Sequence, residues 1–229
     1  MGEMPRPAVT RMVEDYLTLI WKAYEWPDGE PSTTDLAAQL GVTASTVSAN
    51  LKKLARDGFI DYEAYGRITL TNAGRVIAVE IVRRHRIIET YLVQQLGLGW
   101  DQVHDEADRL EHAVSDIVLD RMDAVLGHPL ADPHGDPIPT ASGNVTANHA
   151  QPLTDIPAGS EVEITRVSDR SPEVLRYLDA HGITVGTRLY VHAVSVPASV
   201  IDLTVGDTRI ELSLTAASAI HVCPTDPPS

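Results

Sequence analysis

The feature that most constrains this chain is the stretch H-D-E-A-D-R-L-E-H at residues 104–112. On a helix of about 3.6 residues per turn, Asp108, Glu111 and His112 share one face, with His104 one turn before Asp108. An apolar stripe adjoins this face and consists of Val103, Ala107, Leu110 and Val114. Because burial of isolated charge is costly and a divalent cation offsets it, the pattern indicates a cation site. The alternative is a solvated acidic helix face.

Two further observations restrict the ligands of such a site. His85 and Glu89 repeat the i, i+4 spacing on another predicted helix. The only cysteine, Cys223, provides neither a disulfide framework nor a thiolate site within one chain. Any metal must therefore be bound by oxygen and imidazole, which suits manganese or ferrous iron more than copper and leaves zinc open.

Length and charge set the class of protein. The 229 residues can form one large or two small domains with real cores. No apolar stretch approaches the roughly 20 residues of a membrane span, and the start M-G-E-M-P-R-P lacks a signal-peptide core, so we expect a cytoplasmic protein without a membrane partner. A net charge of -14 argues against DNA binding over the whole surface, whereas residues 52–86 are locally basic.

The first third of the chain predicts a winged helix. Helical periodicity covers about residues 9–26, 33–40 and 44–57, and Thr43 can cap the third helix. The second and third helices with their short glycine-containing turn form a helix-turn-helix, and alternation across 59–71 predicts a β-hairpin after it. Such helix pairs also occur as plain packing units, but the hairpin favours DNA binding.

The outward face of the third helix carries small polar and basic groups that suit a major groove and its phosphates. The predicted DNA-binding residues are Thr43, Ser45, Thr46, Asn50, Lys52, Lys53 and Arg56.

A long helix from residue 72 or 73 to about 96 is apolar on more than one side and needs a second burial surface. We expect a homodimer, whose twofold axis would place two recognition helices about 34 Å apart. The acidic helix is predicted from about Trp100 to Val114. Another follows from Asp116 to Leu126, capped by Ser115, with four inward apolar residues: Ile117, Val118, Met122 and Val125.

From Gly127 to Pro152 the composition changes to Pro, Gly, Asp, Asn and His, which predicts a linker or extended tether. His128, His134 and His149 lie there without regular spacing, so we do not expect them to bind metal. The last third predicts a small β-barrel with strands at 161–167, 187–194, 199–205 and 208–214 and a short helix at 172–180.

In this order and spacing, several motifs make the chain resemble the diphtheria toxin repressor family of metal-dependent transcriptional regulators, in its three-domain, manganese-type form. The motifs are V-E-D-Y-L, L-T-N-A-G-R, R-R-H-R-I-I-E, H-D-E-A-D-R-L-E-H-A-V-S-D and D-P-H-G-D-P-I-P. The resemblance implies an α+β fold with an SH3-like terminal barrel. It also implies a regulatory metal shell of Asp15, Asp108, Glu111 and His112, and a second or neighbouring site with His85, Glu89 and His104.

Two departures bear on the metal. Iron-responsive members carry methionine where Asp15 stands and cysteine where Asp108 stands, so the oxygen donors here favour manganese. Short manganese regulators carry glutamate where Thr18 stands, so the second site is expected to draw on the barrel instead, with Asp169 as the candidate acid.

These patterns predict a winged helix at 1–72, a helical dimerisation and metal-binding domain at 73–140, a linker at 141–152 and an SH3-like, FeoA-like barrel at 153–229. We expect a manganese-dependent repressor of metal-uptake genes that binds double-stranded palindromic operator DNA, with zinc or cobalt as substitutes in vitro. No enzymatic activity or small-molecule substrate is expected. The alternatives are an iron(II)-dependent repressor, a metal-dependent hydrolase with an open coordination position and a nearby base, and an adaptor whose barrel binds a protein.

Overall fold

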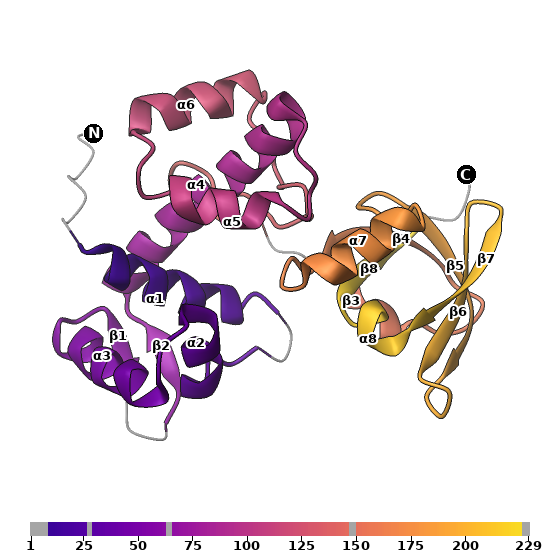
Figure 1. Cartoon of the computed structure of the whole chain (residues 1–229), viewed down its shortest axis with the longest axis horizontal. Coiled ribbons are helices and arrows are strands. Elements are labelled where there is room, and N and C mark those ends of the chain that lie inside the picture. Colours follow the sequence, from indigo (N-terminus) through magenta and orange to yellow (C-terminus); the bar gives the residue numbers. More distant parts are fainter. Residues whose placement is uncertain (1–8, 27–28, 63–65, 147–149, 226–229) are drawn as a thin grey trace. The chain divides into compact units, whose positions relative to one another are not determined.

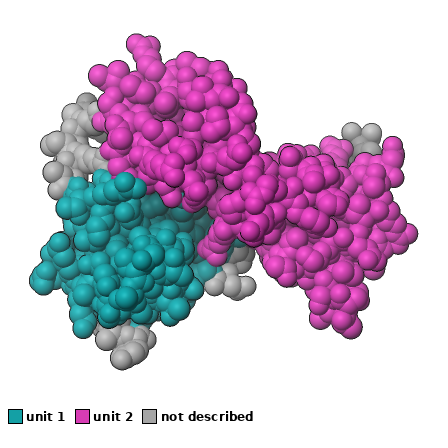
Figure 2. Space-filling view, viewed as in Figure 1, with its two compact units in different colours: residues 1–84, 139–144 teal, residues 85–138, 145–229 magenta. Residues whose placement is uncertain are grey.

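The computed structural model describes residues 9–26, 29–62, 66–146 and 150–225. The chain divides into two compact units, residues 1–84 with 139–144 and residues 85–138 with 145–229 (Figure 2). Within the described ranges no helix has both the length and the apolar character to span a membrane.

The first unit contains the predicted helix-turn-helix and hairpin, in the predicted order (Figure 1). Its elements are α1 (Arg11–Ala23), α2 (Thr33–Leu40), α3 (Ala44–Arg56), β1 (Ile60–Tyr62) and β2 (Ile68–Leu70). The backbone N–H of Thr46 donates to Thr43 Oγ1, which caps α3 as predicted. Gly41 ends α2 in the left-handed conformation, with φ 64°. The predicted hairpin includes residues 63–65, which lie outside the described residues.

The core of this unit comes from the apolar faces that periodicity predicts. Leu17 and Ile20 of α1 and Val47, Leu51 and Leu54 of α3 are fully buried. Each such side chain contributes about 1.5–3 kcal/mol by leaving water. The packing of α3 therefore fixes which of its residues face solvent.

The long helix is α4 (Asn72–Leu96), which matches its predicted range, begins in the first unit and continues into the second. The acidic helix is shorter than predicted, because α5 runs only from Val103 to Leu110. The backbone N–H groups of Ala113 and Val114 both donate to Leu110 O, each at 2.9 Å, so the chain tightens into a turn. Glu111 keeps helical dihedrals at the C-cap (φ -57°, ψ -32°).

The next helix, α6 (Asp116–Val125), is in place, but of its four predicted inward residues only Met122 packs against the core of the second unit. Ile117, Val118 and Val125 are 76%, 45% and 61% exposed, and the buried residues are Leu119 and Asp123. Periodicity locates an apolar face without saying which surface covers it.

The prediction of a tether from Gly127 onward is wrong for residues 132–138, most of which are buried. Ala131 and Pro137 form an isolated β-bridge that closes the loop D-P-H-G-D-P. A Cβ at Gly135 (φ 84°) would lie 2.0 Å from the carbonyl oxygen of Thr165, so the loop packs against β4 (Glu161–Val167) only with glycine there. Tertiary packing orders a segment whose composition resembles a linker.

The terminal part of the second unit is a six-stranded antiparallel sheet in the order β3-β8-β4-β5-β6-β7 (Figure 1). Besides β4 its strands are β3 (Gln151–Pro152), β5 (Arg188–Ser195), β6 (Val200–Val205), β7 (Thr208–Ser213) and β8 (Ile220–Pro224). The helices α7 (Pro172–Ala180) and α8 (Leu214–Ala217) share its core. The four predicted strands and the helix are confirmed, whereas β3, β8 and α8 were not predicted.

Candidate metal centre

Four predicted ligands from three segments meet in the second unit, and we name them the His104 cluster: His85, Glu89, His104 and Asp169. Glu89 Oε1 lies 2.9 Å from His85 Nε2 and 3.3 Å from His104 Nδ1. His104 Nδ1 also lies 3.0 Å from Oδ2 of Asp169, which follows β4. One potential ligand atom from each residue lies within 4.8 Å of all the others, so the donor set fits one cation bound by oxygen and imidazole.

A second group, the Glu111 cluster, consists of Asp108, Glu111 and His112. His85 Nδ1 lies 2.6 Å from Glu111 Oε2 and 3.3 Å from Asp108 Oδ1. Glu111 Oε1 lies 3.2 Å from His112 Nε2. The Nε2 atom of His85 therefore faces the other members of the His104 cluster, and its Nδ1 atom faces the Glu111 cluster. Because a neutral imidazole has one donor and one acceptor, His85 can offer a lone pair to one cluster while it donates a proton to the other.

A third group contains a histidine that the sequence analysis set aside. Glu89, Asp132 and His134 are buried and bring one potential ligand atom each within 4.8 Å of one another. His134 Nδ1 lies 3.7 Å from Glu89 Oε2, and His134 Nε2 lies 2.8 Å from Trp100 O. No spacing rule detects this group, since the loop brings His134 to α4 by tertiary packing. The only local signal is the motif D-P-H-G-D-P-I-P.

Buried arginines neutralise the acids of the same loop. Arg86 Nε lies 3.5 Å from Asp132 Oδ2, and Arg86 Nη2 lies 3.5 Å from Asp136 Oδ2. Arg166 pairs with the other oxygen of Asp136. Arg86 also donates to Pro137 O at 2.8 Å. Sequence reasoning missed these four charged residues, which attach the loop to α4 and β4.

The electrostatics of the second unit favour positive charge beside Glu89. Burial opposes its ionisation, yet His85, His104 and His134 hold the pKa of Glu89 well below its usual range. Burial also opposes protonation of His134, but the Glu89 carboxylate raises the pKa of His134 to about 10. Burial, helped by Asp136 and Glu89, raises the pKa of Asp132 to about 8. Such clustered shifts are typical of functional sites.

The remaining predicted metal ligand, Asp15, lies in the first unit on α1, with Oδ2 3.9 Å from the Arg11 guanidinium. Thr18, one turn later, is 6% exposed, and its hydroxyl has no hydrogen-bond partner within the described part of the chain.

The predicted DNA-binding residues lie on or just before α3 and are exposed, except for Asn50. Asn50 is partly buried and its Nδ2 donates to Tyr16 Oη at 3.0 Å. The Thr43 hydroxyl lies 2.8 Å from that of Ser45 and 2.9 Å from that of Thr46, so the start of α3 is locally organised. The side chains of Lys52 and Lys53 are exposed to solvent, and so is that of Arg56, whose Nε lies 3.8 Å from Asp57 Oδ1.

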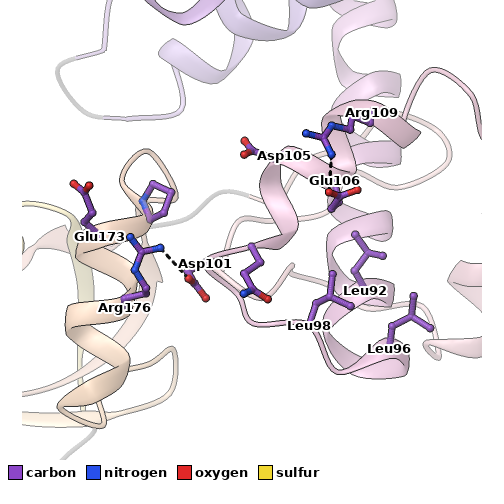
Figure 3. A pocket seen from close by; sticks show the side chains of 11 residues that line it. Leu92, Leu96, Leu98, Asp101, Asp105, Glu106, Arg109, Glu173 and Arg176 are labelled. Atoms are coloured by element: carbon purple, nitrogen blue, oxygen red, sulfur yellow. Dashed lines mark hydrogen bonds and ion pairs between the residues drawn. The ribbon is translucent and has the colours of Figure 1, made fainter.

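A separate cavity in the second unit lies where the end of α4, the start of α5 and the start of α7 approach one another (Figure 3). Arg176 of α7 points to Asp101, with Nη1 3.2 Å from Oδ2, and Arg109 points to Glu106 at 2.7 Å (Figure 3). No member of the three groups described above is among the residues that line this cavity.

Comparison with protein families gives three matches in chain order. The N-terminal DNA-binding domain of iron-dependent repressors matches residues 8–68, their metal-binding and dimerisation domain matches 71–140, and the FeoA domain matches 151–224. The predicted fold class, a winged helix followed by a helical domain and an SH3-like terminal domain, is therefore confirmed.

Among curated relatives, the iron-dependent repressor of Mycobacterium leprae is 32% identical, with 84% of this chain and 88% of that protein covered. The iron-dependent repressor of Mycobacterium tuberculosis is 36% identical, and the match spans only 61% of its length. Among solved structures, a manganese-dependent transcriptional repressor in complex with manganese has a TM-score of 0.89 and 44% identity, covering 93% of this chain and all of that one. The manganese regulator SloR has a TM-score of 0.79 and 28% identity, covering 93% of this chain and 98% of that one.

Proposed function

Because this chain belongs to the iron-dependent repressor family, which includes the diphtheria toxin repressors and consists of metal-dependent transcriptional repressors, we propose that its activating metal is manganese. In this proposal it acts in the cytoplasm as a homodimer on a palindromic operator near genes for manganese uptake. The carrying observation is the donor set: oxygen and imidazole atoms gather in the second unit, with no sulfur among them.

The proposed regulatory shell consists of Asp15, Asp108, Glu111 and His112, and the His104 cluster is the proposed second site. Hard oxygen donors at Asp15 and Asp108 favour manganese over later metals of the series. The likeness to a repressor described with manganese supports this choice, whereas the curated relatives are named for iron. Iron(II) is therefore the alternative that the test must separate.

The two proposed sites would be linked by His85. If its Nδ1–H donates to Glu111, the ring is fixed and Nε2 presents a lone pair to the His104 cluster. A filled second site would then hold His85 in the orientation that positions Glu111 for the regulatory shell. Histidine ligands are commonly oriented by a carboxylate in this way.

Regulation would proceed by a population shift. Asp15 belongs to the first unit, and Asp108, Glu111 and His112 belong to the second. Bound metal would supply the charge and coordination that make one arrangement of these residues more stable than the others. A ligand shifts such an equilibrium only by its differential affinity, and a shell with members in both units provides that difference.

Residues 71–140 match the metal-binding and dimerisation domain of the family, which supports a dimer. The apolar residues Ile117, Val118 and Val125 on α6 are exposed in the single chain and offer a surface for a second copy. A twofold dimer would present two α3 helices to two half-sites of a palindrome.

The test is a titration of purified full-length protein on promoter DNA with manganese, ferrous iron, zinc or cobalt at controlled free concentrations. We expect operator binding to strengthen with manganese at lower free concentrations than with ferrous iron. If ferrous iron activates operator binding at lower free concentrations than manganese, the activating metal is iron(II) and the proposal of manganese is wrong. Binding that no metal alters would overturn metal regulation altogether.

The second site has its own test, since Asp169 is its only member from the terminal domain. Asp169→Ala should lower the metal affinity of the His104 cluster and weaken metal-activated DNA binding. The matched control is Asp179→Ala, an exposed acid on α7 outside the clusters. Equal metal affinities of Asp169→Ala and the parent would remove the terminal domain from the metal mechanism.

A further inference from the structure

Strand β7 (Thr208–Ser213) forms one edge of the terminal sheet (Figure 1). Among the described residues it pairs only with β6, and residues 208–212 make no other backbone hydrogen bond there. The opposite edge strand, β3, has only two residues, one of them a proline. Edge strands can pair with another chain unless some feature prevents or directs the pairing. The long free edge of this sheet is therefore at β7.

The hairpin geometry determines which backbone groups of β7 face outward. A two-residue turn joins β6 to β7, and the pair Val205–Thr208 closes it. In such a hairpin the closing pair is hydrogen-bonded, and bonded and non-bonded pairs alternate along the ladder. The even-numbered residues of β7 therefore direct their N–H and C=O groups toward β6. Arg209 and Glu211 direct theirs toward the free edge.

The side chains of Arg209 and Glu211 lie on the same face of the sheet and carry opposite charges. Arg209 Nε donates to Asp202 Oδ1 on β6 at 2.9 Å, and the Arg209 side chain is still 66% exposed. Glu211 stands directly opposite Asp202 in the β6–β7 register. Like charges in directly opposed positions destabilise a sheet, so a cation on the outer side of Glu211 would be favourable.

A second copy of β7 can supply that cation in one antiparallel register. With the twofold axis at Ile210, Arg209 of each copy lies opposite Glu211 of the other. Each such pair can exchange two N–H···O bonds, because the backbone groups of both residues face outward. An axis at Arg209 or at Glu211 would place identical charges opposite each other, which is unfavourable. Charge therefore selects the register centred on Ile210.

We propose that the free edge of β7 pairs antiparallel with β7 of a second copy of this chain, in the register centred on Ile210. Charges of one sign would keep a second copy away, whereas the opposite charges at Arg209 and Glu211 are self-complementary. The contact uses neither α6 nor any of the three groups of potential metal ligands, so it goes beyond the proposed function. A dimer formed through α6 would carry two free edges, and edge pairing would join such dimers into larger assemblies.

The test is sedimentation velocity on the full-length chain without metal or DNA, at protein concentrations up to about 1 mM. We expect an association step that depends on both charged residues. Arg209→Glu and Glu211→Arg each place like charges opposite one another and should weaken this step about tenfold, because the twofold axis repeats the altered pair. The matched controls, Arg188→Glu and Asp179→Arg, make the same changes of charge at exposed positions outside β7 and should leave it unchanged.

Charge exchange separates edge pairing from a general effect of net charge. Arg209→Glu combined with Glu211→Arg restores opposite charges in the same register and should recover parent-like association. A mixture of the two single variants should form mixed pairs, because one variant carries two acids and the other two arginines at these positions. The proposal is overturned if neither single reversal weakens association, or if neither the exchange nor the mixture restores it. A parent chain with no association step beyond those of both single variants overturns it equally.

Discussion

The recognition helix α3 exposes its polar side chains to solvent, whereas the middle of α4 buries them. The buried residues of α3 are all apolar, and its hydroxyl and basic groups face solvent. Between residues 85 and 90, α4 buries His85, Arg86, Glu89 and Thr90. The polar side chains of α3 are therefore accessible to an external partner, whereas those of α4 are enclosed by the protein itself.

The difference has an energetic consequence. Polar groups on α3 remain hydrated, so most substitutions there should change binding and leave folding nearly intact. Charges on α4 have lost water and rely on mutual pairing or on a cation, so removal of one partner leaves another uncompensated. Effects on stability should therefore concentrate in the second unit, and effects on DNA recognition in the first.

The largest expected effect is on folding. Arg86→Met leaves Asp132 and Asp136 without a shared buried cation and should lower the free energy of unfolding by about 3–5 kcal/mol. The matched control is Arg109→Met, whose ion pair with Glu106 is exposed and should contribute no more than about 1 kcal/mol. Urea denaturation of both variants measures the difference. Equal losses would mean that burial does not distinguish these pairs.

His112→Ala should abolish metal-stimulated DNA binding and leave the dimer folded, because it removes a proposed metal ligand rather than core volume. At the manganese concentration that saturates the parent protein, we expect the operator affinity of the variant to fall about 100-fold or more. Loss of residues that only orient metal ligands already costs roughly 10–100-fold in metal affinity. Fluorescence anisotropy with labelled operator gives the affinity, and sedimentation gives the oligomeric state. Parent-like binding with manganese would show that His112 is misassigned.

Asn50→Ala should weaken binding by about 1–3 kcal/mol at one operator position, if its amide reads a base. The structure adds a complication, since the amide donates to Tyr16 Oη. Tyr16→Phe removes that bond and keeps Asn50, so it is the control. If Tyr16→Phe and Asn50→Ala weaken all operator variants alike, Asn50 positions α3 and reads no base.

Asp15→Met combined with Asp108→Cys should shift the response from manganese toward ferrous iron by about tenfold, because softer donors favour the later metal. The ratio of half-activating concentrations for the two metals, measured on the same operator, gives the shift. The charge-preserving control is Asp15→Glu with Asp108→Glu. An unchanged metal ranking in the Met and Cys variant would exclude ligand softness as the source of selectivity.

The smallest effect is expected at Lys53, which is exposed on α3. If it contacts only phosphate, Lys53→Ala should weaken all sequences alike and lower the slope of log affinity against log salt by about one. Arg188→Ala, an exposed cation of the terminal domain, is the control and should keep the slope. A parent-like slope for Lys53→Ala would place Lys53 away from the DNA backbone.

Sequence patterns predicted the first unit and the strands of the terminal domain well, because local periodicity and capping determine them. Thr43 caps α3 through a contact three residues away, which a sequence can display. The approach of His134 to Glu89 depends on Gly135 packing against Thr165, and that of Asp136 to Arg166 depends on the same packing. Such contacts are long-range, so spacing rules could not predict them. The prediction for α6 failed for a different reason, since Ile117, Val118 and Val125 form an apolar face that is exposed within one chain.

The central claim, that metal and DNA binding are coupled, is tested most directly by measuring manganese affinity with and without operator DNA. By thermodynamic linkage, the factor by which manganese strengthens operator binding must equal the factor by which operator strengthens manganese binding. Competition with a chelator of known affinity, performed on the free protein and on its operator complex, gives the second factor. The account predicts tighter manganese binding in the complex, by the same factor as in the DNA titration. Identical manganese affinities in the two states would contradict it.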